Sequence, residues 1–211
     1  MTNVTELRDH WYWRPGWEVG RSFYTWHITF AAAPEVATLA EQYAAALADL
    51  PEYDPIPLEW LHLTMQGIGF TDEVERGIID QVVDAARTRL AEVAPVTVTI
   101  GPAEIDPEAL RLPVQPVEPL TGIRDAIRAA IADVRGPDNV TESPDYRPHV
   151  SLGYTNTTGP AHRALEALAR HEPRTAQVTV DSVALIDLHR DHRMYQWTTV
   201  AEARLGDGDR S

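Results

Sequence analysis

Two short segments, one midway along each half of the chain, share a single pattern: histidine, apolar residue, hydroxyl residue, apolar residue. They occupy residues 62–65 and 149–152, and both lie in stretches of strand character. Successive side chains of a β-strand point to opposite faces of a sheet, so residues two apart share a face. The sequence therefore predicts that the histidine and the hydroxyl of each segment project together, while the apolar residues beside them face a core.

The composition narrows the chemistry open to these residues. The 211 residues include no cysteine, and all 18 basic residues are arginine. Thiol nucleophiles, thiolate metal sites, Schiff bases, adenylated lysines and phosphate-binding loops that need a lysine are therefore excluded. Any chemistry must rely on histidine, carboxylates, hydroxyls or a bound metal.

The charge and the hydropathy pattern indicate the environment of the chain. The formal net charge is −14, so we expect no broad nucleic-acid-binding surface, because binding many phosphates needs a basic patch. The sequence has no apolar run of about 18 residues and no basic-then-apolar leader at its N-terminus. We therefore expect a cytoplasmic protein with no membrane segment. We also expect a monomer.

The spacing of apolar residues predicts an α+β fold. Residues 1–21 form an aromatic N-terminal arm, residues 22–205 a single bilobal domain, and residues 206–211 a frayed tail. Helices are predicted at 34–50, 71–93, 120–134 and 159–171, and strands at 23–31, 58–68, 96–105, 109–114, 149–155, 177–188 and 194–205. Both halves repeat a motif strand, a helix and a pair of strands, which favours two lobes whose motif strands face each other across a cleft.

The two motifs resemble the H-x-[ST]-x signatures of the 2H phosphoesterase superfamily, which includes 2′-5′ RNA ligases and cyclic phosphodiesterase-like proteins. Residues 147–153 are particularly similar to the second signature, and residues 183–197 resemble the family's closing pair of strands. The resemblance spans residues 22–204. It implies a bilobal, pseudo-two-fold arrangement in which each lobe is an antiparallel sheet with helices on its outer side, and a central cleft lies between the sheets.

The paired motifs supply the groups needed to transfer a phosphodiester. Imidazole titrates near pH ~6.5, so one of His62 and His149 can accept a proton from water or a sugar hydroxyl while the other donates one to the departing oxygen. Thr64 and Ser151 would hydrogen-bond the phosphate oxygens that gain charge. We expect these four residues to be catalytic, with no cofactor and no metal required. Which histidine is the acid depends on how the substrate is oriented, and the sequence leaves this open.

The resemblance implies hydrolysis of a 2′,3′-cyclic phosphate or a 2′-5′ linkage in a small nucleotide or an RNA end. The reverse reaction, in which a 5′-hydroxyl opens the cyclic phosphate, would be a 2′-5′ ligation. We favour hydrolysis because water greatly outnumbers any hydroxyl acceptor. Two alternatives remain: a binding module that kept the cleft but lost turnover, and a metal-dependent hydrolase built on His27, His62 and His149 with nearby carboxylates.

Five further residues are candidates for substrate binding: His27, Arg147, Tyr24, Trp26 and Tyr154. His27 opens a third H-x-T pattern and opposes the apolar face of its strand, so it either lines the cleft or is a half-exposed strand histidine. Arg147 would anchor a phosphate or form a surface ion pair. The aromatic residues would stack a nucleobase or simply pack.

The remaining histidines give no comparable signal. His189 and His192 lie in the turn of the closing hairpin, where a solvated tip is favoured over a metal site. His10, His162 and His171 carry no recognisable pattern.

Overall fold

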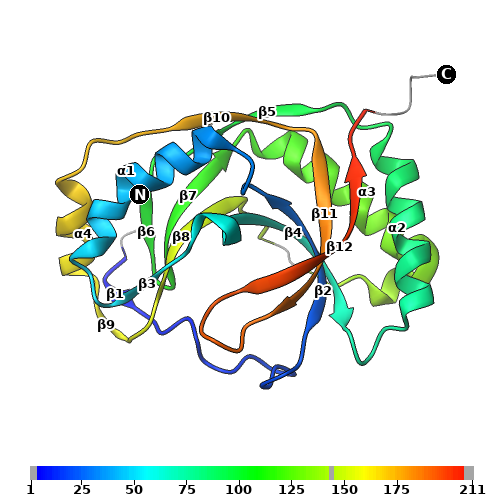
Figure 1. The fold of residues 1–211 in the computed structure, drawn as a ribbon, viewed down its shortest axis with the longest axis horizontal. Helices are drawn as coiled ribbons and strands as arrows, with labels where there is room; N and C mark the ends of the chain where they lie inside the picture. The colour runs from blue at the N-terminus through cyan, green and yellow to red at the C-terminus, as the bar shows by residue number, and fades with distance from the viewer. Residues whose placement is uncertain (1–3, 143–144, 207–211) are drawn as a thin grey trace.

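The computed structural model describes residues 4–142 and 145–206, and it has the α+β architecture that the sequence predicts. Two antiparallel sheets lie side by side, each with helices on its outer side (Figure 1). The expected bilobal arrangement is therefore confirmed. Among the described residues, no helix has the length and apolar character needed to cross a membrane.

The first lobe is built on a sheet with the strand order β10-β5-β7-β8-β3, in which β6 also pairs with β7. Its strands are β3 (Tyr53–Pro55), β5 (Val96–Ile100), β6 (Glu104–Asp106), β7 (Ala109–Gln115), β8 (His149–Thr155) and β10 (Ala176–Val180). Helix α1 (Pro34–Ala48) packs against β10 and β3, and α4 (His162–Ala169) packs against β6. Both helices lie on the left of Figure 1.

The second lobe is built on a sheet with the order β12-β11-β2-β4. Its strands are β2 (Phe23–Thr29), β4 (His62–Phe70), β11 (Ser182–His189) and β12 (Gln196–Arg204). Helices α2 (Arg76–Leu90) and α3 (Val117–Arg135) pack against each other, with α2 against β12 and α3 against β4. A short 3-10 helix, η2 (Pro137–Asn139), follows α3.

The two lobes are interleaved along the chain. Helix α1 follows β2 but packs on the first sheet, whereas α3 follows β7 but packs near β4 of the second. Strands β10 and β11 are consecutive in sequence and belong to different sheets. These crossings tie the lobes together and bring β4 into contact with β8 at the centre of the molecule.

The alternation predicted for the motif strands is confirmed by burial. Leu63 and Met65 on β4, and Val150 and Leu152 on β8, are all buried in the core. Burying such a side chain stabilises the fold by roughly 1.5–3 kcal/mol. The core therefore fixes which face of each strand turns inward, and the histidine and hydroxyl of each motif project from the opposite face.

Some strand boundaries in the first half differ from the prediction. Residues 51–57, expected to be a loop, contain β3, which is too short to show an alternation and forms by pairing with β8. The strand expected from residue 58 begins instead with a 3-10 turn, η1 (Leu58–Trp60), so that β4 starts at His62.

Three other boundaries also need correction. Helix α2 begins at Arg76, not at Thr71, because the Thr71 hydroxyl lies 2.9 Å from the Ser22 hydroxyl and does not cap the helix. The strand expected over 96–105 is divided into β5 and β6 where Gly101, with a φ of 90°, turns the chain. The strand expected over 177–188 is divided at Asp181, where the chain passes from one sheet to the other.

The N-terminal arm contacts both lobes. Strand β1 (Glu6–Leu7) pairs with β9 (Gly159–Pro160) in the first lobe. At the other end of the arm, Arg21 forms an ion pair of 2.9 Å with Asp72, close to the start of α2. The arm therefore runs from one lobe to the other, along the lower edge of Figure 1. Of the tail expected at 206–211, residues 207–211 lie outside the described residues.

Candidate active site

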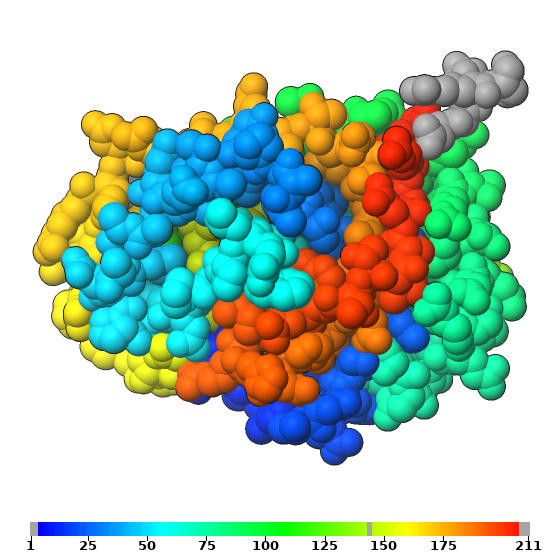
Figure 2. Space-filling model, viewed as in Figure 1, coloured from blue at the N-terminus to red at the C-terminus, as the bar shows by residue number. Residues whose placement is uncertain are grey.

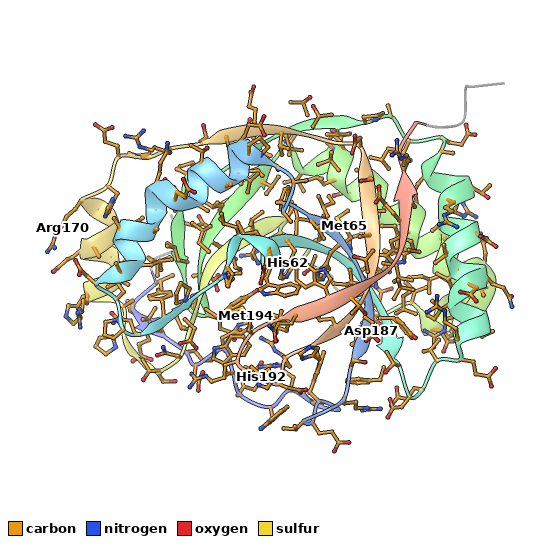
Figure 3. The ribbon with its side chains drawn as sticks, in the orientation of Figure 1. His62, Met65, Arg170, Asp187, His192 and Met194 are labelled. Carbon is orange, nitrogen blue, oxygen red and sulfur yellow. The ribbon has the colours of Figure 1, made fainter. Side chains whose placement is uncertain are left out.

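A cleft of about 610 Å³ opens between the two sheets. Six of the residues singled out from the sequence line it: His27, His62, Thr64, His149, Ser151 and Tyr154. They come from β2, β4 and β8, and His62 lies near the middle of the molecule (Figure 3). The fold therefore brings both motifs to one shared space.

The two motif histidines are held in the same way. Nδ1 of His62 lies 2.8 Å from the carbonyl oxygen of Trp60, and Nδ1 of His149 lies 2.7 Å from the carbonyl oxygen of Arg147. A carbonyl can only accept a hydrogen bond, so each Nδ1 carries the proton that it donates. In the neutral ring, Nε2 is then the free basic nitrogen, and both rings offer this atom to the cleft.

The charges around the two histidines differ. Burial, together with positive charge on His149 or His10, lowers the pKa of His62 to about 4, against the opposing effect of the Trp60 carbonyl. Burial also lowers the pKa of His149, and Arg111 adds to this effect. Asp106 and Glu104 act in the opposite direction on His149. The second histidine therefore has nearby carboxylates that favour its protonated form, and the first does not.

His27 supports the first motif from within the protein. It is 2 % exposed, and its ring is stacked parallel to that of His62 with the centroids 4.3 Å apart. Its Nε2 lies 3.3 Å from the Thr64 hydroxyl. Burial, together with the neighbouring His62, holds the pKa of His27 well below its ordinary value, so this ring is neutral. His27 is thus a buried wall of the cleft and not the half-exposed strand histidine of the alternative reading.

The second motif has a different cross-strand neighbour. Ser151 on β8 is paired with Arg111 on β7, just as Thr64 is paired with His27. The Arg111 guanidinium lies 2.8 Å from Glu104 and 2.9 Å from Asp106. The pseudo-symmetric positions therefore hold a neutral imidazole in one lobe and a neutralised cation in the other. The sequence reasoning missed Arg111, because an arginine on a strand resembles an ordinary solvent-facing residue.

An indole ring covers His62 on the side of the second sheet, and a second indole supports the first. Trp197 on β12 packs edge-to-face against His62 with the centroids 5.3 Å apart, and Trp60 packs edge-to-face against Trp197 at 4.8 Å. Figure 2 shows the segment of η1 (cyan) beside β12 (orange to red) on one face of the molecule. Trp197 and the stacked ring of His27 thus bury most of the His62 ring, and this burial is the main cause of its lowered pKa.

Three of the predicted substrate-binding residues lie outside this cleft. Trp26 is fully buried and Tyr24 is nearly so, both on the core face of β2, where a substrate cannot reach them. Strand alternation already places both residues on the face opposite His27, so predicting them to bind substrate was wrong because it followed residue type and not the strand face. Arg147 is exposed and lines an adjoining recess of about 350 Å³ beside His149.

The arm and the closing hairpin supply cleft residues that the motifs did not indicate. His10, Arg14 and Trp17 of the arm and Tyr195 of the hairpin line the cleft. The density of aromatic residues in the arm was the available signal, and His10 itself gave none. The hairpin is also not a solvated tip throughout, because Arg190 is only 4 % exposed.

The cleft offers proton-transfer groups and hydroxyls. Within residues 4–142 and 145–206, no three histidine, aspartate or glutamate side chains are grouped in a way that could hold a metal ion. The groups that the cleft presents can donate hydrogen bonds from Thr64 and Ser151 and can accept or donate protons at the Nε2 atoms of His62 and His149.

The fold and the cleft define a class of protein in which two pseudo-symmetric lobes each bring one H-x-[ST] strand to a shared site. A family model described as the 2′-5′ RNA ligase superfamily matches residues 34–192, and the chain belongs to this superfamily. The resemblance inferred from the motifs is thereby confirmed.

Solved structures share the fold of this chain. The protein TT0787 of Thermus thermophilus is 17 % identical, with 90 % of this chain and 100 % of that chain covered and a TM-score of 0.66. E. coli LigT in apo form is 16 % identical, with 88 % and 98 % covered and a TM-score of 0.60. LigT complexed with 3′-AMP is 17 % identical, with the same coverage and a TM-score of 0.61. No curated protein matches the sequence.

The lowered pKa of His62 should make the fold less stable in acid. The unfolded chain binds a proton at this residue near pH ~6.5, whereas the folded chain does so only at about 4. Between these values the unfolded state holds more protons, so stability falls as the pH falls. From His62 alone we expect the free energy of unfolding to drop by about 2 kcal/mol between pH ~7 and pH ~5, measured by urea denaturation.

Two variants separate this effect from general acid sensitivity. His62→Gln should lose about that much of the pH dependence, whereas His192→Gln, at an exposed hairpin position, should retain it. If wild type and His62→Gln have the same pH dependence of stability, folding does not lower the pKa of His62.

Proposed function

We propose that this protein is a metal-independent phosphodiesterase that hydrolyses a 2′,3′-cyclic phosphate or a 2′-5′ linkage of a nucleotide or an RNA end. Two-histidine acid–base catalysis would carry the reaction, and its reversal would give a 2′-5′ RNA ligase activity. One observation carries the proposal: His62 and His149 line the same cleft, and each donates its Nδ1 proton to the carbonyl two residues before it.

The surroundings of the two histidines suggest their roles in hydrolysis. His62, enclosed by Trp197 and His27, stays neutral and would accept a proton from the attacking water through Nε2. His149, with Asp106 and Glu104 nearby, would carry the proton that it donates to the departing ribose oxygen. As the water oxygen bonds to phosphorus, the bond to the ribose oxygen breaks, and the two protons travel in opposite directions across the cleft.

The hydroxyls would stabilise the phosphate as its charge grows. His27 is neutral, and when its Nε2 proton is donated to the Thr64 oxygen, the Thr64 hydroxyl is free to donate to a phosphate oxygen. Ser151 would do the same from β8. A bound phosphodiester anion also raises the pKa of a histidine beside it, which favours protonation of His149 in the complex.

The substrate class fits the neighbours of this fold. Structures of LigT have been solved with 3′-AMP, with NADP+ and with ATP, all of which are small nucleotides. The cleft volume of about 610 Å³ lies in the range typical of small-molecule sites. We therefore favour a nucleotide or the last residue of an RNA as the occupant of the cleft.

Removing either histidine should abolish most of the activity. His62→Ala and His149→Ala should each lower the turnover of nucleoside 2′,3′-cyclic phosphates and 2′-5′ dinucleotides by about 10²- to 10⁴-fold, because each removes one proton transfer. Product formation is measured by chromatography in the presence of a chelator, with the exposed His192→Ala as the matched control.

The same assay separates the rival functions. Equal rates for wild type and the His62→Ala/His149→Ala double variant would contradict the proposal. Binding of these nucleotides by calorimetry, without turnover, would identify a binding module. Activity that disappears in chelator and returns with a divalent metal would identify a metal-dependent hydrolase.

The plot of kcat/KM against pH should be bell-shaped, with its maximum at acidic pH. The free enzyme is active when His62 is unprotonated and His149 is protonated, and burial lowers the pKa of both. The maximum of kcat/KM should therefore lie between the pKa of His62, about 4, and the ordinary histidine value of ~6.5.

A carboxylate variant tests the assignment of the acid. Asp106 raises the pKa of His149, so Asp106→Asn should move the alkaline limb of the profile to lower pH. Asp133→Asn, at an exposed ion pair on the second lobe, should leave the limb where it is. A maximum above pH ~8, or an unmoved limb in Asp106→Asn, would contradict the assigned roles.

A further inference from the structure

One wall of the cleft contains a chain of three polar groups that the two-histidine mechanism does not use. Nε2 of His10 lies 3.1 Å from the Tyr195 hydroxyl, and Nδ1 of the same ring lies 3.3 Å from Oε2 of Glu108. The second contact is a close approach of the carboxylate to the ring, not a well-aligned hydrogen bond. His10, Glu108 and Tyr195 all line the cleft. His10 and Tyr195 also lie outside residues 34–192, the part that matches the family model.

The charge of Glu108 is fixed by its neighbours. Burial alone would raise the pKa of this carboxyl, but His10, Arg14 and Arg8 outweigh it and lower the pKa to about 2. Arg14 lies 2.9 Å and Arg8 2.5 Å from its oxygens. Glu108 is therefore a carboxylate near neutral pH, and it can only accept hydrogen bonds.

The carboxylate decides which nitrogen of His10 carries the proton. Burial lowers the pKa of His10, so the ring is neutral near pH ~7 and holds one proton. An anion beside Nδ1 favours the proton there, which leaves Nε2 as an acceptor. The Tyr195 hydroxyl must then donate its proton to Nε2. Arg14, which can only donate, lies beside the same hydroxyl and favours the same orientation.

This orientation determines what Tyr195 offers to a substrate. Once its proton is directed at His10, the hydroxyl oxygen can only accept further hydrogen bonds. The oxygen is also held in place: His10 is stacked on Tyr154 with the centroids 4.0 Å apart, and the Tyr195 ring packs edge-to-face against Tyr154 at 5.4 Å. The edge of Tyr195 also meets the His62 ring, with centroids 6.2 Å apart. The fixed acceptor therefore belongs to a ring that packs against the ring of one of the two motif histidines.

We propose that Tyr195 is a specificity-determining residue that accepts a hydrogen bond from a ribose hydroxyl of the substrate, with His10 and Glu108 as the positioning residues that fix its orientation. This inference rests on the proposed function, because it assumes a nucleotide in the cleft. The anion of a phosphodiester has no proton to give, so Tyr195 selects the sugar and leaves the phosphate to Thr64, Ser151 and the histidines.

Two pairs of ligands that differ by one hydroxyl test the proposal. The first pair is 3′-AMP and its 2′-deoxy analogue, compared by calorimetric binding. The second is adenosine 2′,3′-cyclic phosphate and its 5′-deoxy analogue, compared by kcat/KM. In at least one pair the wild type should prefer the hydroxyl-bearing member by about 5- to 100-fold, because the analogue cannot donate a hydrogen bond to the Tyr195 oxygen.

Three variants and a control assign the preference to this chain of groups. Tyr195→Phe keeps the ring and removes the acceptor, so the two members of each pair should become equivalent. His10→Phe keeps a ring against Tyr154 but cannot accept a hydrogen bond from the Tyr195 hydroxyl. Glu108→Gln can donate a hydrogen bond to Nδ1 of His10, which moves the ring proton to Nε2. Both variants should reduce the preference for the hydroxyl-bearing ligand. Tyr12→Phe, at an exposed tyrosine of the same arm, should keep it.

The outcomes distinguish this inference from the proposed function. If the wild type has no preference in either pair, or if Tyr195→Phe keeps the wild-type ratio in both, Tyr195 does not bind a substrate hydroxyl. The phosphodiesterase proposal is unaffected by that result, because it is tested by turnover. If the cyclic phosphate is bound but not turned over, the proposed reaction is wrong. The role of Tyr195 is then still tested by the binding of 3′-AMP and its 2′-deoxy analogue. Melting temperatures identify any variant that has lost its fold, and Tyr195→Phe then decides alone.

Discussion

The two-residue period of a β-strand is the constraint on which this site depends. On β4 and β8, burial of Leu63 and Val150 on the core face turns the neighbouring histidine toward the cleft. A second local interaction then fixes each ring, because its Nδ1 donates to the carbonyl two residues earlier in the chain. Hydrophobic packing thus sets the direction of the side chain, and one hydrogen bond sets its tautomer. The interleaving of the lobes brings the two strands together.

The pseudo-symmetry of the backbone is broken by the side chains around the two imidazoles. His62 is enclosed by Trp197 and the stacked ring of His27, which disfavours its charged form. His149 lies near Arg111 and the carboxylates that bind this arginine, so its surroundings are polar. Two histidines with the same hydrogen bond can therefore have opposite roles, because solvation and charge differ on the two sides of one cleft.

The sequence was sufficient for the fold class, the motif strands and the pairing of His62 with His149, because alternation and a repeated pattern are local signals. Alternation also places Trp26 on the face opposite His27, so the expectation that this fully buried ring binds substrate followed residue type and not the strand face. The sequence could not identify His10 or Arg111. Both reach the site only through long-range contacts, His10 through an arm that spans the lobes and Arg111 through its register opposite Ser151. Tertiary placement, not residue type, gives these side chains their role.

The central claim is that both imidazoles contact a single anion. It can be tested directly by titrating inorganic phosphate into protein labelled with ¹⁵N at histidine, with the ring signals assigned through His62→Gln and His149→Gln. The account predicts that the Nε2 signals of both residues shift together and give one dissociation constant, and that each variant weakens the response of the other ring. A response from only one of the two histidines, or two different dissociation constants, would contradict it.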